Sequence, residues 1–105
     1  MKVTAWNNGS HHSTGAGYGL KISIEDRDSN FDRSWSAVEV ELPNGEVVES
    51  NIDKDSFWGP KCRELISKQF GAWFIERNLA PWDKGAPPVL ELEHVSDNRF
   101  RLSET

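Results

Sequence analysis

The segment that most resembles a chemical site is a run of alternating glycines between Thr14 and Gly19. Glycine-rich turns bind phosphate groups when they follow a strand and open a helix, because bare backbone and a helix N-terminus then meet the anion. In this chain the glycines precede a strand pattern, and Gly19-Leu20-Lys21 lacks the Gly-Lys-Ser/Thr ending of a P-loop. The context therefore disfavours a nucleotide site.

The same segment alternates like a strand, which we place at residues 16–25. Tyr18 and the apolar residues at every second position after it fall on one face, and glycines fall on the other. The bare positions are Gly15, Gly17 and Gly19. Such a glycine face lets a ring, a second backbone or a ligand approach closely. We expect an aromatic ring to cover it, with Trp6 and Trp35 as the candidates.

Polar residues around this strand supply the groups of a small-molecule site, namely His12, Tyr18, Arg27 and Asp28. Arg27 would bind an anion bidentately if its guanidinium points into a pocket, and otherwise pairs with nearby carboxylates. A histidine with Asp26 and Asp28 would suit a divalent cation. The spacing is not that of a metal motif, however, and residues of these types in loops are normally solvated. We therefore expect neither a metal nor a cofactor.

Three tryptophans are candidates for contact with a ligand or a partner: Trp6, Trp58 and Trp82. Trp58 and Trp82 lie in segments that contain proline and glycine, which favours loops. Rings exposed on loops stack on a sugar or base, or anchor a protein partner, whereas buried rings close the ends of a small core. The sequence leaves both roles open.

Cys62 is the single cysteine, which excludes an intramolecular disulfide. In the first turns of a helix a thiol becomes a better nucleophile, and a Cys-His enzyme would then need His12 or His94 within reach. Cys62 falls on the apolar stripe of a predicted helix, so we expect a buried and inert side chain. We also expect His94 to be half-buried, and we assign no catalytic residue.

Composition limits the classes of partner. The net charge is −5 over 105 residues and there is no basic stripe, which disfavours binding to nucleic acid or to an anionic membrane. No apolar run approaches the roughly 20 residues that a membrane-spanning helix needs. The N-terminus turns polar directly after Val3 instead of forming a secretory signal, so we expect a cytoplasmic protein.

One long amphipathic helix is predicted from about residue 55 to Asn78. Asp55 or Ser56 can cap its start, and Pro60 is tolerated within its first turn. Apolar residues at helical spacing form one wide stripe along it. They are Trp58, Cys62, Leu65, Ile66, Phe70, Trp73 and Phe74.

Strand patterns flank this helix on both sides. They cover 2–6, 16–25, 35–42 and 46–52 before it, then 89–95 and 99–102 after it, with a charged turn at 26–30. Asn44-Gly45 between two alternating runs is a strong hairpin signal. The last two runs, 89–95 and 99–102, are predicted to form a second hairpin around Ser96-Asp97-Asn98. The sequence thus predicts a single α+β domain over residues 1–105. Its mainly antiparallel sheet of five to six strands would pack against the one long helix.

Five short segments together resemble small bacterial hypothetical proteins of the kind carried on mobile gene cassettes, such as those of integrons. They are Trp6-Asn7-Asn8-Gly9, Thr14-Gly15-Ala16-Gly17-Tyr18-Gly19, Asp26-Arg27-Asp28, Ser56-Phe57-Trp58 and Pro81-Trp82-Asp83-Lys84-Gly85. The resemblance spans most of the chain. It implies no particular activity, and it assigns no role to any residue.

The five Trp and five Phe residues, without an assembled catalytic set, favour a noncatalytic binding or interaction module. Its partner would be a second copy, as a homodimer, or another protein, and a small-molecule ligand stays open. The alternative is a small enzyme or a protein that binds a small anionic ligand through the N-terminal glycine-rich segment. A third hypothesis, an acidic mimic or regulator of nucleic-acid binding, would require glutamates clustered on one sheet face.

Overall fold

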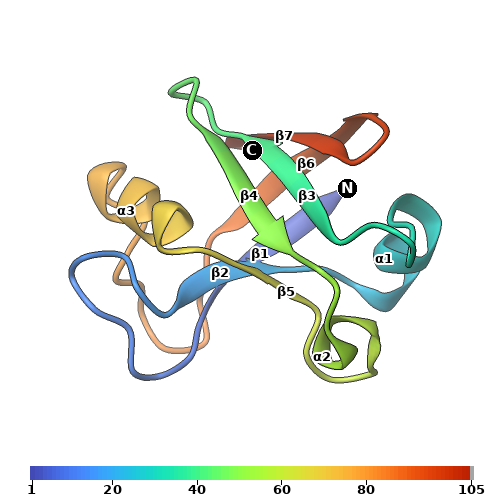
Figure 1. Cartoon of the computed structure of the whole chain (residues 1–105). Helices are drawn as coiled ribbons and strands as arrows, with labels where there is room; N and C mark the ends of the chain where they lie inside the picture. The colour runs from blue at the N-terminus through green and yellow to red at the C-terminus, as the bar shows by residue number, and fades with distance from the viewer. Residues whose placement is uncertain (105) are drawn as a thin grey trace.

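Seven strands form one curved sheet in a computed structural model that describes residues 1–104 (Figure 1). In chain order they are β1 (Lys2–Asn7), β2 (Tyr18–Lys21), β3 (Ala37–Glu41), β4 (Val47–Asn51), β5 (Glu64–Ile66), β6 (Val89–Ser96) and β7 (Arg99–Glu104). In space the order is β4-β3-β7-β6-β1-β2-β5. Neighbouring strands are antiparallel except β3 and β7, which run parallel. The predicted α+β class and mainly antiparallel sheet are confirmed, but the strand count was too low.

The sheet curls until its two edge strands nearly meet. The Ser50 hydroxyl on β4 donates a hydrogen bond to the Ile66 carbonyl oxygen on β5, at 3.3 Å. A side chain thus bridges the two edges where the sheet order shows no ladder between them. The result is a nearly closed, barrel-like sheet with a seam between β4 and β5.

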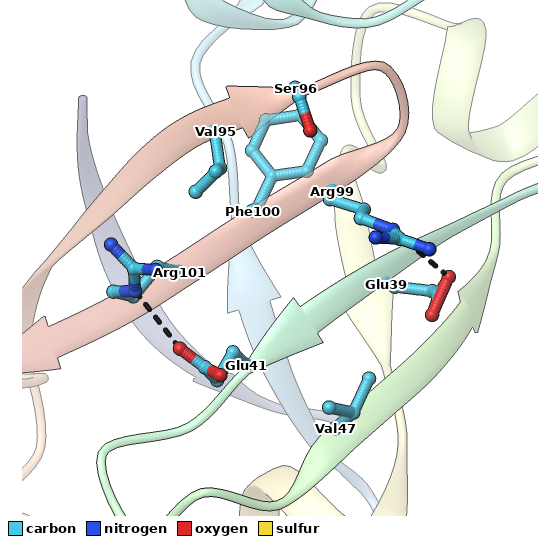
Figure 2. Close-up of a pocket in the computed structure, with 8 residues that line it drawn as sticks. All are labelled: Glu39, Glu41, Val47, Val95, Ser96, Arg99, Phe100 and Arg101. Atoms are coloured by element: carbon cyan, nitrogen blue, oxygen red, sulfur yellow. Dashed lines mark hydrogen bonds and ion pairs between the residues drawn. The ribbon is translucent and has the colours of Figure 1, made fainter.

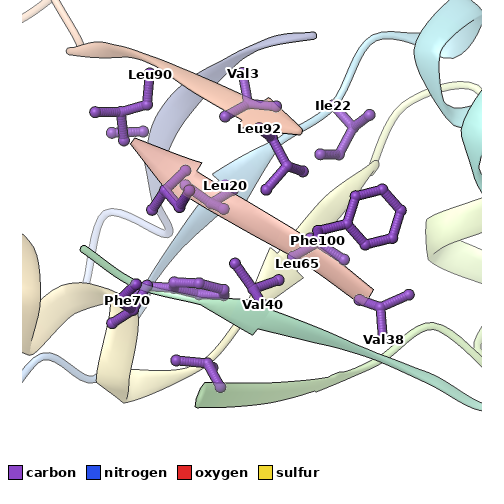
Figure 3. Close-up of a cluster of buried hydrophobic side chains, with 14 of the residues drawn as sticks. Val3, Leu20, Ile22, Val38, Val40, Leu65, Phe70, Leu90, Leu92 and Phe100 are labelled. Carbon is purple, nitrogen blue, oxygen red and sulfur yellow. The ribbon is translucent and has the colours of Figure 1, made fainter. Parts of the chain in front are cut away.

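The interior of this curved sheet is the hydrophobic core (Figure 3). Strand alternation fills it: on β3, Val38 and Val40 are fully buried, whereas Glu39 and Glu41 face outward. Each large apolar side chain removed from water in this way contributes about 1.5–3 kcal/mol. The labelled core residues of Figure 3 are Val3, Leu20, Ile22, Val38, Val40, Leu65, Phe70, Leu90, Leu92 and Phe100.

Three short helices complete the fold: α1 (Ile24–Asn30), α2 (Asp55–Trp58) and α3 (Lys68–Glu76). In Figure 1, α1 and α2 lie together at one end of the curved sheet, and α3 lies at the other end. Side chains at one end of the sheet therefore pack against α1 and α2, and those at the other end pack against α3.

The prediction of one long helix is wrong. The chain forms α2, turns at Gly59-Pro60, adds the short strand β5, and only then begins α3 behind the Ser67 cap. Leu65 pairs with Leu20 on β2, so its backbone hydrogen bonds go to a strand and not to a helix. Proline lacks the N–H that a helix interior needs, which separates the two helical pieces. Cys62 falls in the connecting turn and is exposed, so its predicted burial is also wrong.

The predicted charged turn at 26–30 is a helix instead. The Ser23 side chain accepts a hydrogen bond from the Asp26 backbone N–H at 3.1 Å and caps α1. Glu25 and Asp26 then occupy the first turn, where carboxylates favour the positive end of the helix dipole. The strand predicted over 16–25 is correspondingly short, because β2 ends at Lys21.

The two predicted hairpins are confirmed. β3 and β4 join through Pro43-Asn44-Gly45, with Gly45 at a φ of 90° that favours glycine. β6 and β7 form the second hairpin, with a register irregularity between His94 and Ser96 at the end of the sheet. The His94 ring stacks on Phe100, with ring centroids 4.7 Å apart, but the residue is exposed and not half-buried as predicted.

Candidate functional site

Backbone atoms are the nearest neighbours of the bare positions at Gly15 and Gly19, and the Asn8 side chain is the nearest at Gly17. Gly15 has a φ of 101°, and a Cβ there would overlap the Lys68 carbonyl oxygen of α3. At Gly19 a Cβ would overlap the Leu65 carbonyl oxygen of β5. The predicted close approach is therefore confirmed, with backbone as the nearest cover at these two positions. Trp35, one of the two predicted rings, packs against His94 and Phe100 elsewhere. Trp6, the other, pairs with Gly19 across the β1–β2 ladder, which places its side chain on the same face of the sheet as the bare position.

Tyr18 belongs to an aromatic cluster that packs β2 against α3. Its ring centroid lies 6.0 Å from that of Phe74 and 5.7 Å from that of Trp82. The neighbouring His11 ring lies 5.0 Å away, whereas the predicted His12 hydrogen-bonds with Thr14 in the exposed loop. Tyr18 is buried and Trp82 is half-buried against the core, so these aromatic rings stabilise the packing of β2 on α3 and do not form a ligand site.

Burial raises the pKa of the Tyr18 phenol above its ordinary value. Because Tyr18 is the sole tyrosine, phenolate absorbance at alkaline pH reports on this residue alone. A raised folded-state pKa means that Tyr18 contributes stability below about pH 10, its unfolded pKa, and loses it as pH rises through the folded pKa. We expect phenolate formation in the native protein to begin above that pH and the melting temperature to fall over the same range. Equal midpoints of the phenolate titration in native and urea-unfolded protein would contradict this. The Tyr18→Phe variant, which has no phenol, gives the background absorbance.

Arg27 is locked inside the fold at the opposite end of β2. It is 7% exposed, and its Nη1 donates to the carbonyl oxygens of Phe57 at 3.0 Å and Gly59 at 2.7 Å. Its Nε donates to the Asp28 carboxylate at 3.1 Å. These bonds tie α1 to α2, so the guanidinium serves the fold and is not presented to an anion.

The sequence-predicted site residues therefore divide into two groups. Tyr18 and Trp82 contact Phe74 of α3, whereas Arg27 contacts both Asp28 and Trp58 around α1 and α2. β2 lies between the two groups, with Tyr18 at its start and α1 following its end. His12 and Trp6 lie outside both.

The second group borders an open hollow, which we call the tryptophan hollow, of about 600 Å³. Its lining includes Asp28, Asp32, Arg33, Trp35, Trp58 and His94. The Trp58 indole N–H donates to the Ile52 carbonyl oxygen at 2.9 Å, which fixes the ring at the core boundary. The Trp35 and His94 ring centroids lie 6.0 Å apart in an edge-on arrangement. Half-buried indoles thus present fixed aromatic surface to solvent.

A tight turn after α1 positions two of these residues. The Asp32 carboxylate accepts the Ser34 backbone N–H at 2.8 Å, and the Asp32 carbonyl oxygen accepts the Trp35 N–H at 3.0 Å. Hydrogen bonds from the Ser34 side chain, and next from its backbone, hold the pKa of the Asp32 carboxyl below its ordinary value. Asp32 is therefore a carboxylate at neutral pH, beside the exposed Arg33.

A second hollow, of about 410 Å³, lies on the outer face of β3, β6 and β7 (Figure 2). Its Arg101 is paired with Glu41 at 2.9 Å and with Glu93 at 3.4 Å, and Arg99 lies 3.8 Å from Glu39. Each arginine thus has a carboxylate partner. These side chains form a row of solvent-exposed ion pairs across neighbouring strands. Because arginines alternate with the glutamates, this face does not resemble the continuous negative charge of a nucleic-acid mimic.

Neither a three-ligand metal site nor a membrane-spanning helix is present among the described residues. Within residues 1–104, no group of three His, Cys, Asp or Glu side chains is placed to hold a metal ion. No helix in that range has the length and apolarity to cross a membrane.

Comparisons of the chain with protein-family models, curated proteins and solved structures find no match. The tryptophan hollow must therefore be interpreted from its own chemistry.

Sequence reasoning placed Trp58 and Asp28 in a site but missed Arg33, Trp35 and His94. A signal was present: Asp32-Arg33-Ser34-Trp35 begins with the type of residue that folds its side chain back onto the backbone two residues later. Such a turn beside a tryptophan marks a rigid loop with an exposed ring. The contribution of His94 could not be found, because it depends on the alignment of β6 with α1 in space.

Proposed function

We propose that the protein is a noncatalytic binding module and that the tryptophan hollow is its binding site. The observation that carries this proposal is the pair Trp35 and Trp58, two half-buried indoles lining one open hollow with charged groups around them. Ligand sites typically combine fixed aromatic surface with a few polar groups that set orientation. Exposing indole surface is costly, so two such rings at one hollow favour a partner that covers them.

The chemistry of the hollow favours binding over catalysis. A general acid or base works best with a pKa near neutrality, and the Asp32 carboxyl is shifted away from that range. The His94 ring is engaged by packing, because it stacks on Phe100 and its Nε2 is hydrogen-bonded to the Asp97 carbonyl oxygen. Arg27 lies directly behind the hollow but is engaged by carbonyl oxygens and Asp28. The groups in place can stack, hydrogen-bond and attract charge.

The compartment and the partner are part of the same proposal. Cys62 is a free and exposed thiol, a state that persists in a reducing compartment, which supports a cytoplasmic location. The hollow is open, so a ligand carried on another protein, or on a second copy of this chain, can reach it as readily as a free small molecule.

Indole N–H resonances of the five tryptophans test this function. We expect a panel of neutral sugars, nucleosides, organic cations and carboxylates to contain ligands that shift the Trp35 and Trp58 signals. Replacing Trp58 with phenylalanine should weaken binding by up to about 5-fold, because the smaller ring keeps only part of a stacking interaction that contributes about 1–3 kcal/mol in full.

Trp82→Phe is the matched control, because Trp82 is also half-buried but contacts Tyr18 and Phe74 away from the hollow. It should leave ligand affinity unchanged. Ligands that shift only Trp82 or Trp6, or a panel that shifts no indole signal, would overturn the proposed site.

A further inference from the structure

Two guanidinium groups already lie against the Trp58 ring. The central carbon of Arg27 is 5.5 Å from the ring centroid and that of Arg33 is 5.4 Å away. The face of an indole carries negative electrostatic potential and attracts cations at these separations. The geometry thus shows directly that Trp58 is used as a cation-binding surface within its own chain.

The two arginines differ in how they are held. Arg27 is buried and engaged in hydrogen bonds with Phe57, Gly59 and Asp28. Arg33 is exposed, and among residues 1–104 no hydrogen bond or ion pair holds its guanidinium, which rests against the Trp58 ring. At an exposed site such a contact is worth only about 0.5–1 kcal/mol. Arg33 is therefore an easily displaced occupant of the ring face.

The charges around the hollow also select a cation. Asp28 and Asp32 line it, and the adjoining hollow, which shares Asn30 and His94, is lined by Asp26, Glu91 and Glu93. Among the described residues, the linings of these two hollows contain two cationic groups. One is the N-terminal ammonium, which is paired with Glu91, and the other is Arg33. An anionic ligand would meet several carboxylates and one loosely held arginine.

We infer that the tryptophan hollow binds an organic cation, either a guanidinium or an alkylated ammonium group, which replaces Arg33 over Trp58. This inference rests on the proposed binding function of the hollow and names its ligand class. Arg33 fills the position when no ligand is bound and competes with the ligand. The Asp32 carboxylate lies on the rim and complements the incoming charge, whereas the Asp28 carboxylate is already paired with Arg27 and adds less.

Titration of the full chain with tetramethylammonium chloride and with methylguanidinium chloride, against sodium chloride at equal ionic strength, tests this inference. The readout is the Trp58 indole N–H signal. Removing the competitor with Arg33→Gln should tighten the dissociation constant about 2- to 5-fold. Asp32→Asn should weaken it. A response to one cation alone supports the inference and identifies that group as the ligand type.

Neutral and anionic probes separate failure of this inference from failure of the proposed function. tert-Butanol matches tetramethylammonium in shape without its charge, and acetate carries the opposite charge. If a sugar, tert-butanol or acetate shifts Trp58 and neither cation does, the hollow is a binding site but not for cations. Weaker cation binding in Arg33→Gln, with the other indole signals unchanged, would likewise overturn the inference. If no probe of any class moves Trp35 or Trp58, the proposed function itself fails.

Discussion

Replacing Gly71 with alanine is expected to lower the free energy of unfolding by roughly 3 kcal/mol. A Cβ at Gly71 would overlap the Gly15 carbonyl oxygen and lie 2.6 Å from both the Gly15 Cα and the Tyr18 Cδ2. The obstacle is mainly backbone, which cannot rotate away as a flexible side chain would. Steric overlap therefore outweighs the gain of about 1 kcal/mol that alanine normally brings to a helix interior.

Gly59→Ala is the matched control for this prediction. Gly59 has a φ of −82°, which any residue adopts, and a Cβ there would lie 3.4 Å from its nearest neighbour, the Asp55 carbonyl oxygen. It should be neutral, or stabilising by up to about 1 kcal/mol. Urea unfolding followed by far-UV circular dichroism measures both variants. Equal stability of the two would show that α3 and the 14–17 loop can separate at little cost. The tryptophan hollow lies at the other end of the molecule, so its indole signals should be unaffected by Gly71→Ala.

The glycine face shows what a strand pattern could and could not reveal. Alternation predicts a close approach at Gly15 and Gly19, and the structure has one at both, although Gly15 lies in the turn before β2 and not on the strand. Which group arrives depends on α3 and β5, which lie about 50 residues later in the chain. Local periodicity carries no information on that pairing, so the sequence allowed a ring as readily as a backbone.

The long helix failed for a related reason. Leu65 is apolar and buried in either arrangement, so its hydropathy fits a helix stripe and a strand equally well. The sequence pattern predicts that Pro60 lies in the first turn of a long helix, whereas in the structure it follows the end of a four-residue helix. What decides the segment is the vacant edge of β2, where the missing side chain of Gly19 lets β5 approach. That is a tertiary effect which overrides helical spacing.

The tryptophan hollow combines three segments: α1 with its following turn, α2, and the end of β6. Each segment has a residue that the sequence could mark as a candidate. Only the capped helix α1, however, places Asp28 and Arg33 beside the same hollow as Trp58. Reading 26–30 as a turn removed the element that positions them. Ser23 followed by Ile24, Glu25 and Asp26 is a capping pattern, so this part of the site was accessible to sequence reasoning.

Replacing Arg27 with methionine is expected to lower the free energy of unfolding by about 2–4 kcal/mol. Methionine keeps most of the side-chain length and apolar packing, but it leaves the Phe57 carbonyl and its Gly59 neighbour without their donor. A buried polar group without a partner costs about 1–3 kcal/mol, which exceeds the small contribution of the ion pair. The ion pair is weak because the Asp28 side chain is 58% exposed.

Asp28→Asn separates these two terms, because it removes the ion pair but leaves the carbonyl oxygens bonded to Arg27. We expect it to change stability by less than about 1 kcal/mol. Chemical unfolding gives both values, and the Trp58 indole signal should move in Arg27→Met because the α1–α2 link that holds the ring is lost. Equal destabilisation by the two substitutions would mean that the ion pair, and not the carbonyl bonds, holds α1 to α2. The position of the Trp58 ring would then depend on an exposed ion pair, and added salt should weaken the link between α1 and α2 by screening that pair. If Arg27→Met alone is severe, the ring is held from inside the fold, and the exposed Arg33 can be exchanged for a ligand without loss of that support.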